Sequence, residues 1–451
     1  MSAAKTEILD LNRFDVLSAA RLSPNLAGKV ARRQANFGAS SVLFFEQPIE
    51  MVKAEGAYLI DAEGRRYLDV YNNVPSVGHC HPRVVEAITR QVAELNIHTR
   101  YLNGVVDAYA EDLLSRFPAG LDTLMMTCTG SESNDLAMRI ARIATGGQGF
   151  IVTEAAYHGN TALVTEISPS SLRKRTPAPF VAVIPAPEAR DGRDVAESFA
   201  ASVEEAIAAL KARGVALAAL IVDTIFSSDG IHADPPGFLQ KAVAVVRRAG
   251  GVLIADEVQP GFGRTGGDEK GEGLWGFQRH GLVPEIVTMG KPMGNGFPMG
   301  GVVTRSDFVA RFCEETGYFN TFGGNPVAAA AGHAVLKVLD EEGLVQRART
   351  VGAYFRRRLE ALMGVSAEIG AVRGAGLFLG LDFTEPSTGA PDAALARAVI
   401  NALRARGILI GAAGKYGATL KIRPPLCFSN ADVDLFTDTL AEILVQRRAG
   451  V

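Results

Sequence analysis

The sequence predicts an α/β fold, in which a mainly parallel sheet flanked by helices forms a large domain and a smaller α+β domain follows it. Short apolar runs alternate with helical stretches between Leu121 and Thr304, which is the pattern of a parallel sheet. This alternation ends near Asn325, where longer helices begin. The chain has 451 residues, 47% of them hydrophobic, so it is long enough for two domains with substantial cores.

The first part of the chain predicts an arm followed by a hairpin. Residues 1 to about 45 have mixed helical and loop signals and are expected to pack on the body or on a partner. EMVKAEGAYLID and RRYLDVYNN are then two strand-like runs joined across Ala62–Gly64. A helix should begin near Pro82, because apolar residues recur at helical spacing after it.

The middle of the chain should supply the large sheet. The helix SESNDLAMRIARIA and two more, near residues 195–212 and 237–248, separate its strands. Ligands of such sheets bind at the carboxyl ends of the strands. The expected strands are LDTLMMTC, GFIVTE, FVAVIP, LAALIVD, GGVLIADE, EIVTMG and GGVVT.

The last part of the chain should form the small domain. Its expected elements are helices over 326–340, 345–362 and 391–406, the strand-like stretch 367–383, the strands ILIG and ATLKIR, and a last helix capped by Ser429 or Asn430. We therefore divide the chain into residues 1–74, an arm and hairpin that contribute to the small domain, residues 75–325, the large domain, and residues 326–451, the small domain.

Composition excludes several classes of function. A net charge of −3 offers no basic excess for nucleic acid or an anionic membrane. No apolar run is long enough for a membrane span, and the N-terminus lacks the apolar core of a signal peptide, so we expect a cytoplasmic protein. The four cysteines are far apart and are expected to be reduced thiols.

The stretch IVTMGKPMGNGFPMGG, residues 286–301, contains the central candidate residue. Lys291 follows a buried strand and lies between Gly290 and Pro292, in a turn where backbone can approach a bound molecule closely. Burial would lower the pKa of this lysine and make its amine nucleophilic, as a Schiff-base lysine requires. The alternative is a surface lysine in a glycine-rich loop.

Three further motifs at strand ends favour the first interpretation. In TCTGSESND a strand turns through Gly130 and Ser131 into a helix whose first amides suit a phosphate, although both residues also serve as ordinary caps. In GGVLIADEVQ, Asp256 ends an apolar strand, where a carboxylate needs a cation or donor, and Gln259 follows it. A Walker-B-like or metal-binding acid is the alternative for Asp256, but the chain has no GxxxxGK[ST] motif.

Tyr157 of AYHGNT offers an aromatic face for stacking, although isolated aromatic residues are more often core. Together the motifs supply an amine, a carboxylate, a phosphate cradle and a stacking face. Pyridoxal 5'-phosphate has an aldehyde, a pyridine nitrogen, a phosphate and a ring face to match them. His79, Cys80 and His81 are not expected to bind a metal, because adjacent side chains diverge and no fourth ligand has finger-like spacing.

Seven segments between residues 45 and 445 are specific in combination: VGHCHPRVVEAI, CTGSESNDLAMRIAR, AYHGNT, ADEVQPGFGRTG, GKPMGNGFPMGGVV, FNTFGGNPVA and LKIRPPL. They resemble class III aminotransferases of the fold-type-I pyridoxal-phosphate superfamily. Within that class, four segments look most like the branch with ethanolamine-phosphate and phosphohydroxylysine phospho-lyases, which lies close to the alanine–glyoxylate aminotransferases. These four are YNNVPSVGHCHP, TGSESND, AYHGNT and LKIRPPLCFS.

The resemblance implies a role for each candidate. Lys291 would form the Schiff base with pyridoxal 5'-phosphate, and Asp256 would pair with its pyridinium nitrogen. A homodimer is implied, because Thr321 would reach the phosphate of the other subunit's cofactor. The remaining implied contacts are Gly130 and Ser131 with the phosphate, Tyr157 with the ring face, Gln259 near the ring hydroxyl, His158 elsewhere around the cofactor, and Tyr71, Lys421 and Arg423 with the substrate.

The chain departs from the family pattern at the substrate end. Lys421 stands where many members have an arginine that binds an α-carboxylate, with Arg423 two positions later. Asp223 and Ser228 of DTIFSSDG replace the two glutamates of a motif like EPIQGE, the second of which is the gate. A lysine binds anions as a point charge rather than as a planar fork, so glutamate and 2-oxoglutarate are not implied as substrates.

The expected reaction is therefore transfer of an amino group from a small amine or amino acid to a keto acid. The alternative on the same residues is a phospho-lyase that eliminates ammonia and phosphate from a phosphorylated amine. A non-catalytic binding protein is disfavoured, because Lys291 and Asp256 are both present.

Overall fold

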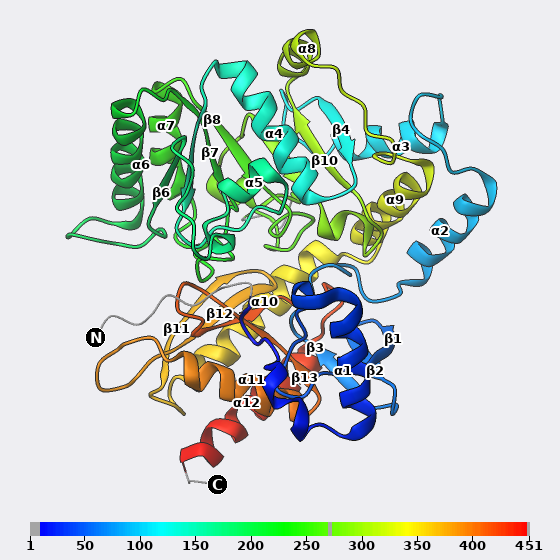
Figure 1. Ribbon diagram of the computed structural model, residues 1–451, viewed down its shortest axis with the longest axis vertical. Coiled ribbons are helices and arrows are strands. Elements are labelled where there is room, and N and C mark those ends of the chain that lie inside the picture. Colours follow the sequence, from blue (N-terminus) through cyan, green and yellow to red (C-terminus); the bar gives the residue numbers. More distant parts are fainter. Residues whose placement is uncertain (1–9, 269–272, 449–451) are drawn as a thin grey trace.

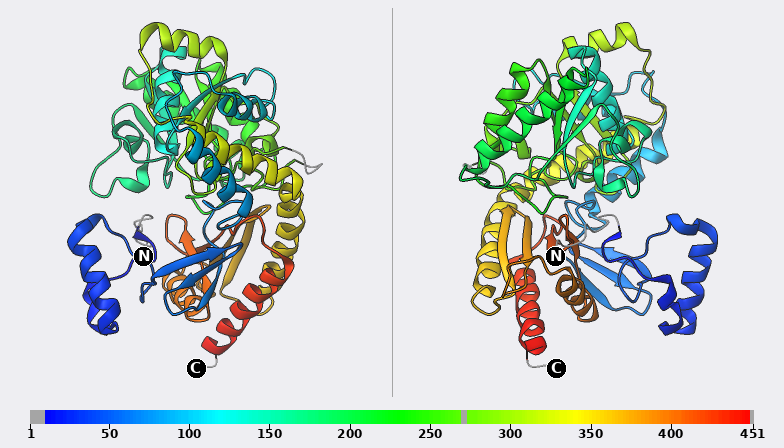
Figure 2. Two further views of the ribbon diagram at one scale, coloured as in Figure 1. Left: turned by 90° about the vertical axis from the view of Figure 1, so that its right-hand side faces the viewer. Right: turned by 60° about the vertical axis from the view of Figure 1, so that its left-hand side comes forward.

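The computed structural model describes residues 10–268 and 273–448 of the chain. Figure 1 shows two layered parts, one built on the largest sheet and the other on two smaller sheets. The arm, helix α1 (Pro24–Phe37), lies beside the smaller sheets, and the rotated views place it at the outside of the molecule (Figure 2). None of the described helices is long and apolar enough to cross a membrane.

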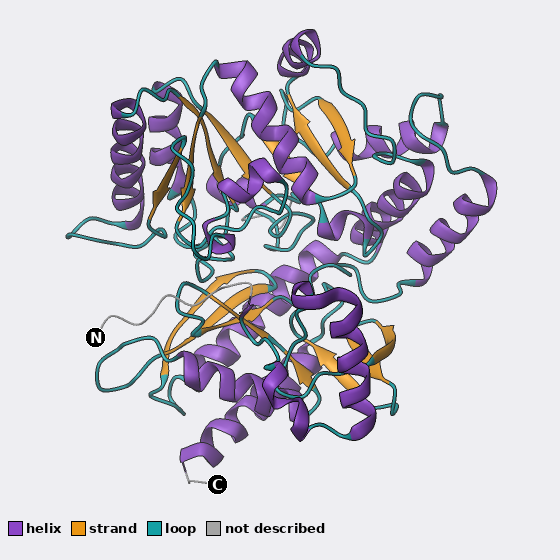
Figure 3. Ribbon diagram, in the orientation of Figure 1, coloured by secondary structure: helices purple, strands orange, loops and turns teal. Residues whose placement is uncertain are grey.

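The largest sheet has seven strands in the order β4-β10-β9-β8-β7-β5-β6. Figure 3 shows strands of this sheet with helices beside them. Its five strands from β6 to β9 along this order are parallel, whereas β10 is antiparallel to both of its neighbours. The mainly parallel sheet predicted from the sequence is thus confirmed. The strands are β4 (Thr123–Thr127), β5 (Gly149–Thr153), β6 (Val181–Ile184), β7 (Leu217–Val222), β8 (Val252–Asp256), β9 (Ile286–Met289) and β10 (Gly300–Thr304).

Helices cover both faces of this sheet, because alternate strand residues point to opposite sides. Phe150 and Ile254 pack with α4 and α8 on one face. Ile151 and Leu253, their neighbours in sequence, pack with α6 and α7 on the other. The helices of this part are α2 (Pro82–Glu94), α3 (Gly104–Leu114), α4 (Gly130–Thr145), α5 (Ala162–Glu166), α6 (Val195–Ala212), α7 (Leu239–Arg248) and α8 (Ser306–Glu315).

Two four-stranded sheets form the other part, in the orders β1-β2-β3-β13 and β11-β12-β15-β14. Strand β13 pairs in parallel with β3, so the N-terminal and C-terminal segments share one sheet. We propose domain boundaries near residues 74 and 325, because this pairing joins the segment before residue 74 to the segment after residue 325. Helix α9 (Pro326–Glu341) follows the proposed boundary in sequence but packs against α2 and α3 of the first part (Figure 1). The elements of the second part are β1 (Met51–Glu55), β2 (Tyr58–Asp61), β3 (Arg66–Asp69), α10 (Leu344–Leu362), β11 (Ile369–Ala375), β12 (Phe378–Phe383), α11 (Ala393–Ala405), β13 (Ile408–Leu409), β14 (Gly411–Ala413), β15 (Thr419–Ile422) and α12 (Asn430–Arg448).

Two stretches that the sequence predicts as single strand-like runs are hairpins in the structure. EMVKAEGAYLID breaks at Gly56, whose φ of 57° suits a turn, so that β1 pairs antiparallel with β2. The stretch 367–383 turns at Gly376 and pairs β11 with β12. The predicted pairing across Ala62–Gly64 is confirmed by β2 and β3, and Ser429 caps α12 by accepting from the Asp432 amide at 3.2 Å.

The short 3-10 helices are η2 (Val16–Arg21), η3 (Gly38–Ser40), η4 (Pro169–Ser171), η5 (Gly276–His280) and η6 (Lys291–Gly294). Helix η6 matters most for function, because it begins at Lys291 directly beyond β9.

Candidate active site

The sequence candidates lie together at the carboxyl edge of the largest sheet. Asp256 is the last residue of β8, and it pairs in parallel register with Thr288 of β9. Lys291 follows three positions later, and Tyr157 lies in the loop after β5. One cavity is lined by side chains or backbone of Gly130, Ser131, Tyr157, His158, Gly159, Asp223, Asp256, Val258, Gln259 and Lys291.

Lys291 has the environment that a nucleophilic amine requires. Burial lowers the pKa of Lys291, and the positive charge of Arg423 lowers it further, while the carboxylates of Asp256 and Asp223 act in the opposite direction. The turn is tight, because a Cβ at Gly290 would lie 3.0 Å from the amide nitrogen of Gly130. The lysine is thereby held against the start of α4.

Asp256 is buried and receives hydrogen bonds from three groups. His158 Nδ1 lies 2.7 Å from Oδ2, and Asn134 Nδ2 donates to the same oxygen at 3.0 Å. The amide of Val258 donates to Oδ1 at 3.1 Å. Asn134 is fixed in turn, because its Oδ1 accepts from Thr288 Oγ1 at 2.7 Å. Both oxygens of the carboxylate are therefore held in place by neighbouring groups.

A compact cradle forms where α4 begins. Thr129 caps the helix by accepting from the Glu132 amide, which leaves the first amides at Gly130 and Ser131 facing the cavity edge. Gly159 has a φ of 140°, and a Cβ there would lie 2.5 Å from Ser131 Oγ. Ser131 Oγ also accepts from the Asn160 amide at 3.2 Å. Two loops thus meet at one helix N-terminus.

These residues fit pyridoxal 5'-phosphate, the cofactor that the sequence predicts. A Cβ at Gly159 would lie against Ser131 at the helix start, and a Cβ at Gly130 would lie 2.9 Å from the side chain of Val258, which lines the same cavity. His158 lines the same cavity, and its Nε2 is buried with no hydrogen-bond partner among the described residues. A helix N-terminus, a carboxylate and an amine that line one cavity match the phosphate, the ring nitrogen and the aldehyde of the cofactor.

The predicted substrate residues Tyr71 and Arg423 lie together beside Gln259. The Arg423 guanidinium lies 4.4 Å from the centre of the Tyr71 ring. Its Nη1 donates to Asn73 Oδ1 at 3.1 Å and to Gln259 Oε1. Gln259 Nε2 donates to Ser227 Oγ at 2.6 Å, so its side-chain amide is held between Ser227 and Arg423.

Lys421 lies on β15, buried beside these groups. Burial and the charge of Arg423 lower the pKa of Lys421 well below its usual value, while Asp223 acts to raise it. Asp223 lines the cofactor cavity, and its carboxylate accepts from the amides of Ile225 and Ser227, each at 3.0 Å. Burial raises the pKa of Asp223, as does the charge of Asp256.

Thr321 does not join the cavity of its own chain. It is exposed, in a loop next to Phe322, whose side chain is 70% exposed. His79 and His81 each contact one carboxylate: His79 Nε2 lies 2.7 Å from Asp69, and His81 Nε2 lies 2.9 Å from Glu342. The two histidines therefore serve separate contacts.

Two groups at this site, Asn134 and Asn73, were not predicted from the sequence, and Asp223 was named only as a departure from the family motif. Asn134 is one turn into α4 from the predicted cradle, and its side chain points to Asp256. Asp223 directly follows β7, so its strand-end position was a usable signal. Asn73 left no signal, because its partner Arg423 is 350 residues away along the chain.

The chain is similar to known proteins over most of its length. The family model described as Aminotransferase class-III matches residues 44–444. An alanine–glyoxylate aminotransferase 2-like protein of Drosophila melanogaster is 37% identical, over 93% of this chain and 88% of its own length. An ethanolamine-phosphate phospho-lyase homolog of Caenorhabditis elegans is 36% identical, over 92% of each.

Among solved structures, a phospholyase from Arthrobacter in complex with phosphoethanolamine is 43% identical and superposes with a TM-score of 0.88. The match covers 92% of this chain and 99% of that one.

Proposed function

The chain belongs to the class III aminotransferase family, and from that premise we propose that it moves the amino group of a small amine or amino acid with a compact anion at its far end to a keto acid. It is an enzyme dependent on pyridoxal 5'-phosphate. The observation that carries the proposal is that Lys291, Asp256 and the start of α4 open into one cavity.

When bound, the cofactor supplies the electron sink that stabilises negative charge on the carbon next to the substrate nitrogen. Asp256 would hold the proton on the ring nitrogen, because its carboxylate is already fixed by His158, Asn134 and the Val258 amide. Lys291, with its lowered pKa, can accept a proton from that carbon and return it.

The anionic end of the substrate would meet Lys421 and Arg423. Tyr71, Asn73 and Gln259 fix the guanidinium of Arg423, so its donors are presented in a set orientation. An arriving anion would favour the protonated form of Lys421, offsetting the burial that lowers its pKa. Ser228, at the gate position, brings no carboxylate to hold these cations aside.

Elimination of phosphate is the second candidate, and a specific observation favours it. The phospholyase that superposes on this chain was solved with phosphoethanolamine, a small amine with a phosphate at its far end. Lys421 and Arg423 offer point-charge and forked donors to such a group. The same Lys291 would remove the proton, and departure of phosphate instead of reprotonation would decide the outcome.

One experiment separates the two reactions. The holoenzyme is incubated with phosphoethanolamine, with ethanolamine as a match that lacks the phosphate, and with alanine, each with and without glyoxylate. Transamination requires the keto acid and yields a new amino acid with no phosphate. Elimination yields equal amounts of ammonia and phosphate without any keto acid. If ethanolamine reacts as well as phosphoethanolamine, the proposed preference for an anionic end is wrong.

We also propose a homodimer in which Thr321 reaches the partner's cofactor phosphate. Thr321 borders exposed apolar side chains: Tyr101 is 65%, Leu102 98% and Phe322 70% exposed. The two loops that carry them adjoin, since a Cβ at Gly324 would lie 3.2 Å from Thr99. A surface of this kind is expected to be covered by another protein surface, here a second copy.

Light scattering on Leu102→Glu tests the dimer. A shift towards monomer with loss of bound cofactor is expected, whereas Val445→Glu, at an exposed position of α12, should leave the dimer intact. A monomeric wild type would refute the proposal. We place the enzyme in the cytoplasm, and cell fractionation checks this against the mitochondrial relatives from Arabidopsis thaliana and Homo sapiens.

A further inference from the structure

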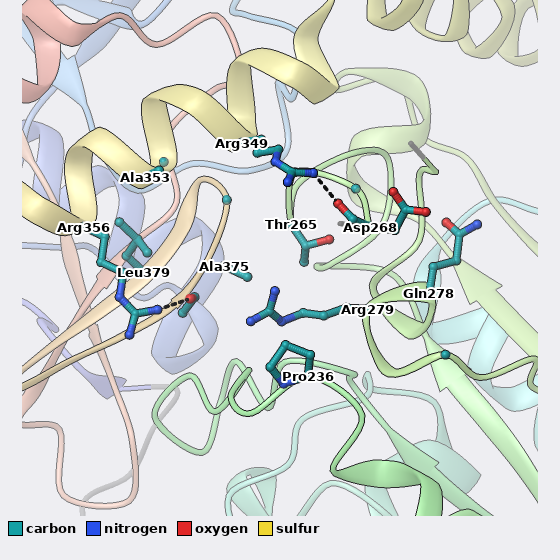
Figure 4. A pocket seen from close by; sticks show the side chains of 16 residues that line it. Pro236, Thr265, Asp268, Gln278, Arg279, Arg349, Ala353, Arg356, Ala375 and Leu379 are labelled. Atoms are coloured by element: carbon teal, nitrogen blue, oxygen red, sulfur yellow. Dashed lines mark hydrogen bonds between the residues drawn. The ribbon is translucent and has the colours of Figure 1, made fainter. Parts of the chain in front are cut away.

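A second cavity, of about 500 Å³, lies apart from the cofactor cavity (Figure 4). Loop residues 265–268 and helix η5 form one side of it, and α10 with the β11–β12 hairpin forms the other. No described residue lines both cavities. Its size is within the range of small-molecule sites, which is roughly 300–1,000 Å³.

Three arginines from different places line this cavity. Arg279 comes from η5, and its guanidinium points into the middle of the space in Figure 4. Arg349 and Arg356 lie two turns apart on α10 and approach from the opposite side. Arginine is the side chain best suited to bind phosphate with two parallel hydrogen bonds.

The nearby carboxylates leave these arginines incompletely paired. Asp234 is shared, because Arg279 Nη2 donates to one of its oxygens and Arg356 Nη1 to the other at 3.1 Å. Arg356 Nε also donates to Glu360 at 2.9 Å. Asp268 has the one carboxylate among the described lining residues. Arg349 Nη1 donates to the backbone oxygen of Asp268 at 2.6 Å.

Several guanidinium donors are consequently spare. Within the described parts of the chain, Arg349 Nε and Nη2, Arg279 Nη1 and Arg356 Nη2 have no hydrogen-bond acceptor. Water can satisfy them, but an anion with several oxygens would satisfy donors of both walls at once. The remaining wall is apolar, made by Pro236, Ala353, Ala375 and Leu379.

The two walls are fixed relative to each other by direct backbone packing. A Cβ at Gly352 of α10 would lie 2.1 Å from the backbone oxygen of Gly376. A Cβ at Gly376 would lie 2.5 Å from the carbonyl carbon of Thr265. The arginines are therefore presented on a framework fixed by backbone packing, which reduces the entropic cost of binding.

We propose that this cavity binds a small phosphorylated molecule with an apolar body, through Arg279, Arg349 and Arg356. The phosphate oxygens accept from the spare donors, and the apolar body lies on the wall of Ala353, Ala375 and Leu379. The site is separate from the cofactor and substrate, so it does not depend on which reaction the enzyme performs.

Calorimetric titration of the holoenzyme with ADP, pyrophosphate and adenosine tests this in phosphate-free buffer. We expect one ADP per protomer, weaker binding of pyrophosphate, and no binding of adenosine. Arg349→Met should weaken ADP binding at least tenfold, whereas Arg357→Met, an exposed arginine of the same helix outside the cavity, should leave it unchanged. Lys421→Met should also leave it unchanged, because Lys421 lies at the substrate end.

Ala353→Glu provides a second variant, since position 353 is exposed on a helix and lines the cavity. The added carboxylate should abolish ADP binding while thermal unfolding stays at the wild-type temperature. The proposal is overturned if ADP gives no heat up to millimolar concentration. It is equally overturned if Arg349→Met and Ala353→Glu both bind ADP as the wild type does, or if Arg357→Met loses as much affinity as Arg349→Met.

Discussion

His158 Nδ1 lies 2.7 Å from the carboxylate of Asp256, and both side chains are buried at the end of the same sheet. The contact joins the loop after β5 to the last residue of β8, so it also sets the position of the neighbouring Tyr157. With Asn134 on the same carboxylate oxygen, the acid is oriented by the protein's own side chains. Electrostatic stabilisation of this kind depends on groups that need not reorganise.

Asp256→Asn should therefore cost several orders of magnitude in kcat while the protein stays folded. The amide keeps the shape and one acceptor but loses the charge that favours a protonated ring nitrogen. Steady-state rates and the visible spectrum of the purified variant measure this. A variant within about tenfold of wild type would remove Asp256 from this role, because that corresponds to only about 1.4 kcal/mol of transition-state stabilisation.

Lys291→Ala should fold and bind cofactor without the covalent bond, and turnover should be nearly abolished. Borohydride reduction followed by peptide mapping should find the cofactor on Lys291 in the wild type. Lys241→Ala is the matched control, because Lys241 is an exposed lysine that pairs with Glu197 far from the cavity. A modified lysine at any other position would end the assignment.

Much of this site follows from the sequence, because apolar strands show where their carboxyl ends lie. Asp256 ends one apolar run and Lys291 follows another, so it could be predicted that both lie at the same edge of the sheet. The antiparallel direction of β10 could also have been predicted from the sequence. Only residues 290–299 connect it to β9, too few for the helical crossover that parallel neighbours need.

Contacts between distant segments could not be predicted in this way. Arg423 meets Gln259 across 164 residues, and no periodicity or spacing encodes that distance. The break at Gly56 was missed for a different reason: glycine is compatible with a strand, and its positive φ becomes visible only in the structure. Thr321 stays a proposal, since one chain alone does not contain its expected partner.

Gly159→Ala should weaken cofactor binding, by about tenfold or more in Kd. The new Cβ would lie 2.5 Å from Ser131 Oγ, and the residue would also keep a strained φ of 140°. Gly120→Ala separates the two causes, because Gly120 has a φ of 92° but nothing within 4 Å of its Cβ. Equilibrium dialysis of the cofactor measures both. Equal losses in the two variants would mean that the cradle is not the reason.

Asp229→Asn should change how stability depends on pH. Burial raises the pKa of Asp229 to about 7 in the folded protein, against 3.8 when unfolded, and Thr153 and the Ala155 amide donate to its carboxylate. Between these values the folded state holds the proton more tightly, so this group's contribution to stability is lost as pH rises from about 4 to about 7.

The asparagine variant lacks this titration. Relative to wild type it should therefore gain in free energy of unfolding as the pH is raised, which chemical denaturation at pH 5 and pH 8 measures. An unchanged difference between the two pH values would contradict the raised pKa.

Lys421→Met should raise KM for amines with an anionic end far more than for neutral amines. Lys421 is buried beside Arg423, and an anion is the one substrate group that offsets the burial of this ammonium. Phosphoethanolamine and ethanolamine form the matched substrate pair, and kcat/KM for both is measured in each variant. Lys415→Met is the control, because Lys415 lies in the turn before β15 and pairs with Glu154 at 2.8 Å.

If Lys421→Met impairs both substrates equally, Lys421 supports the fold of this region and does not select the substrate. Brisk transamination of glutamate with 2-oxoglutarate by the wild type would lead to the same conclusion, since that pair calls for a forked grip on an α-carboxylate.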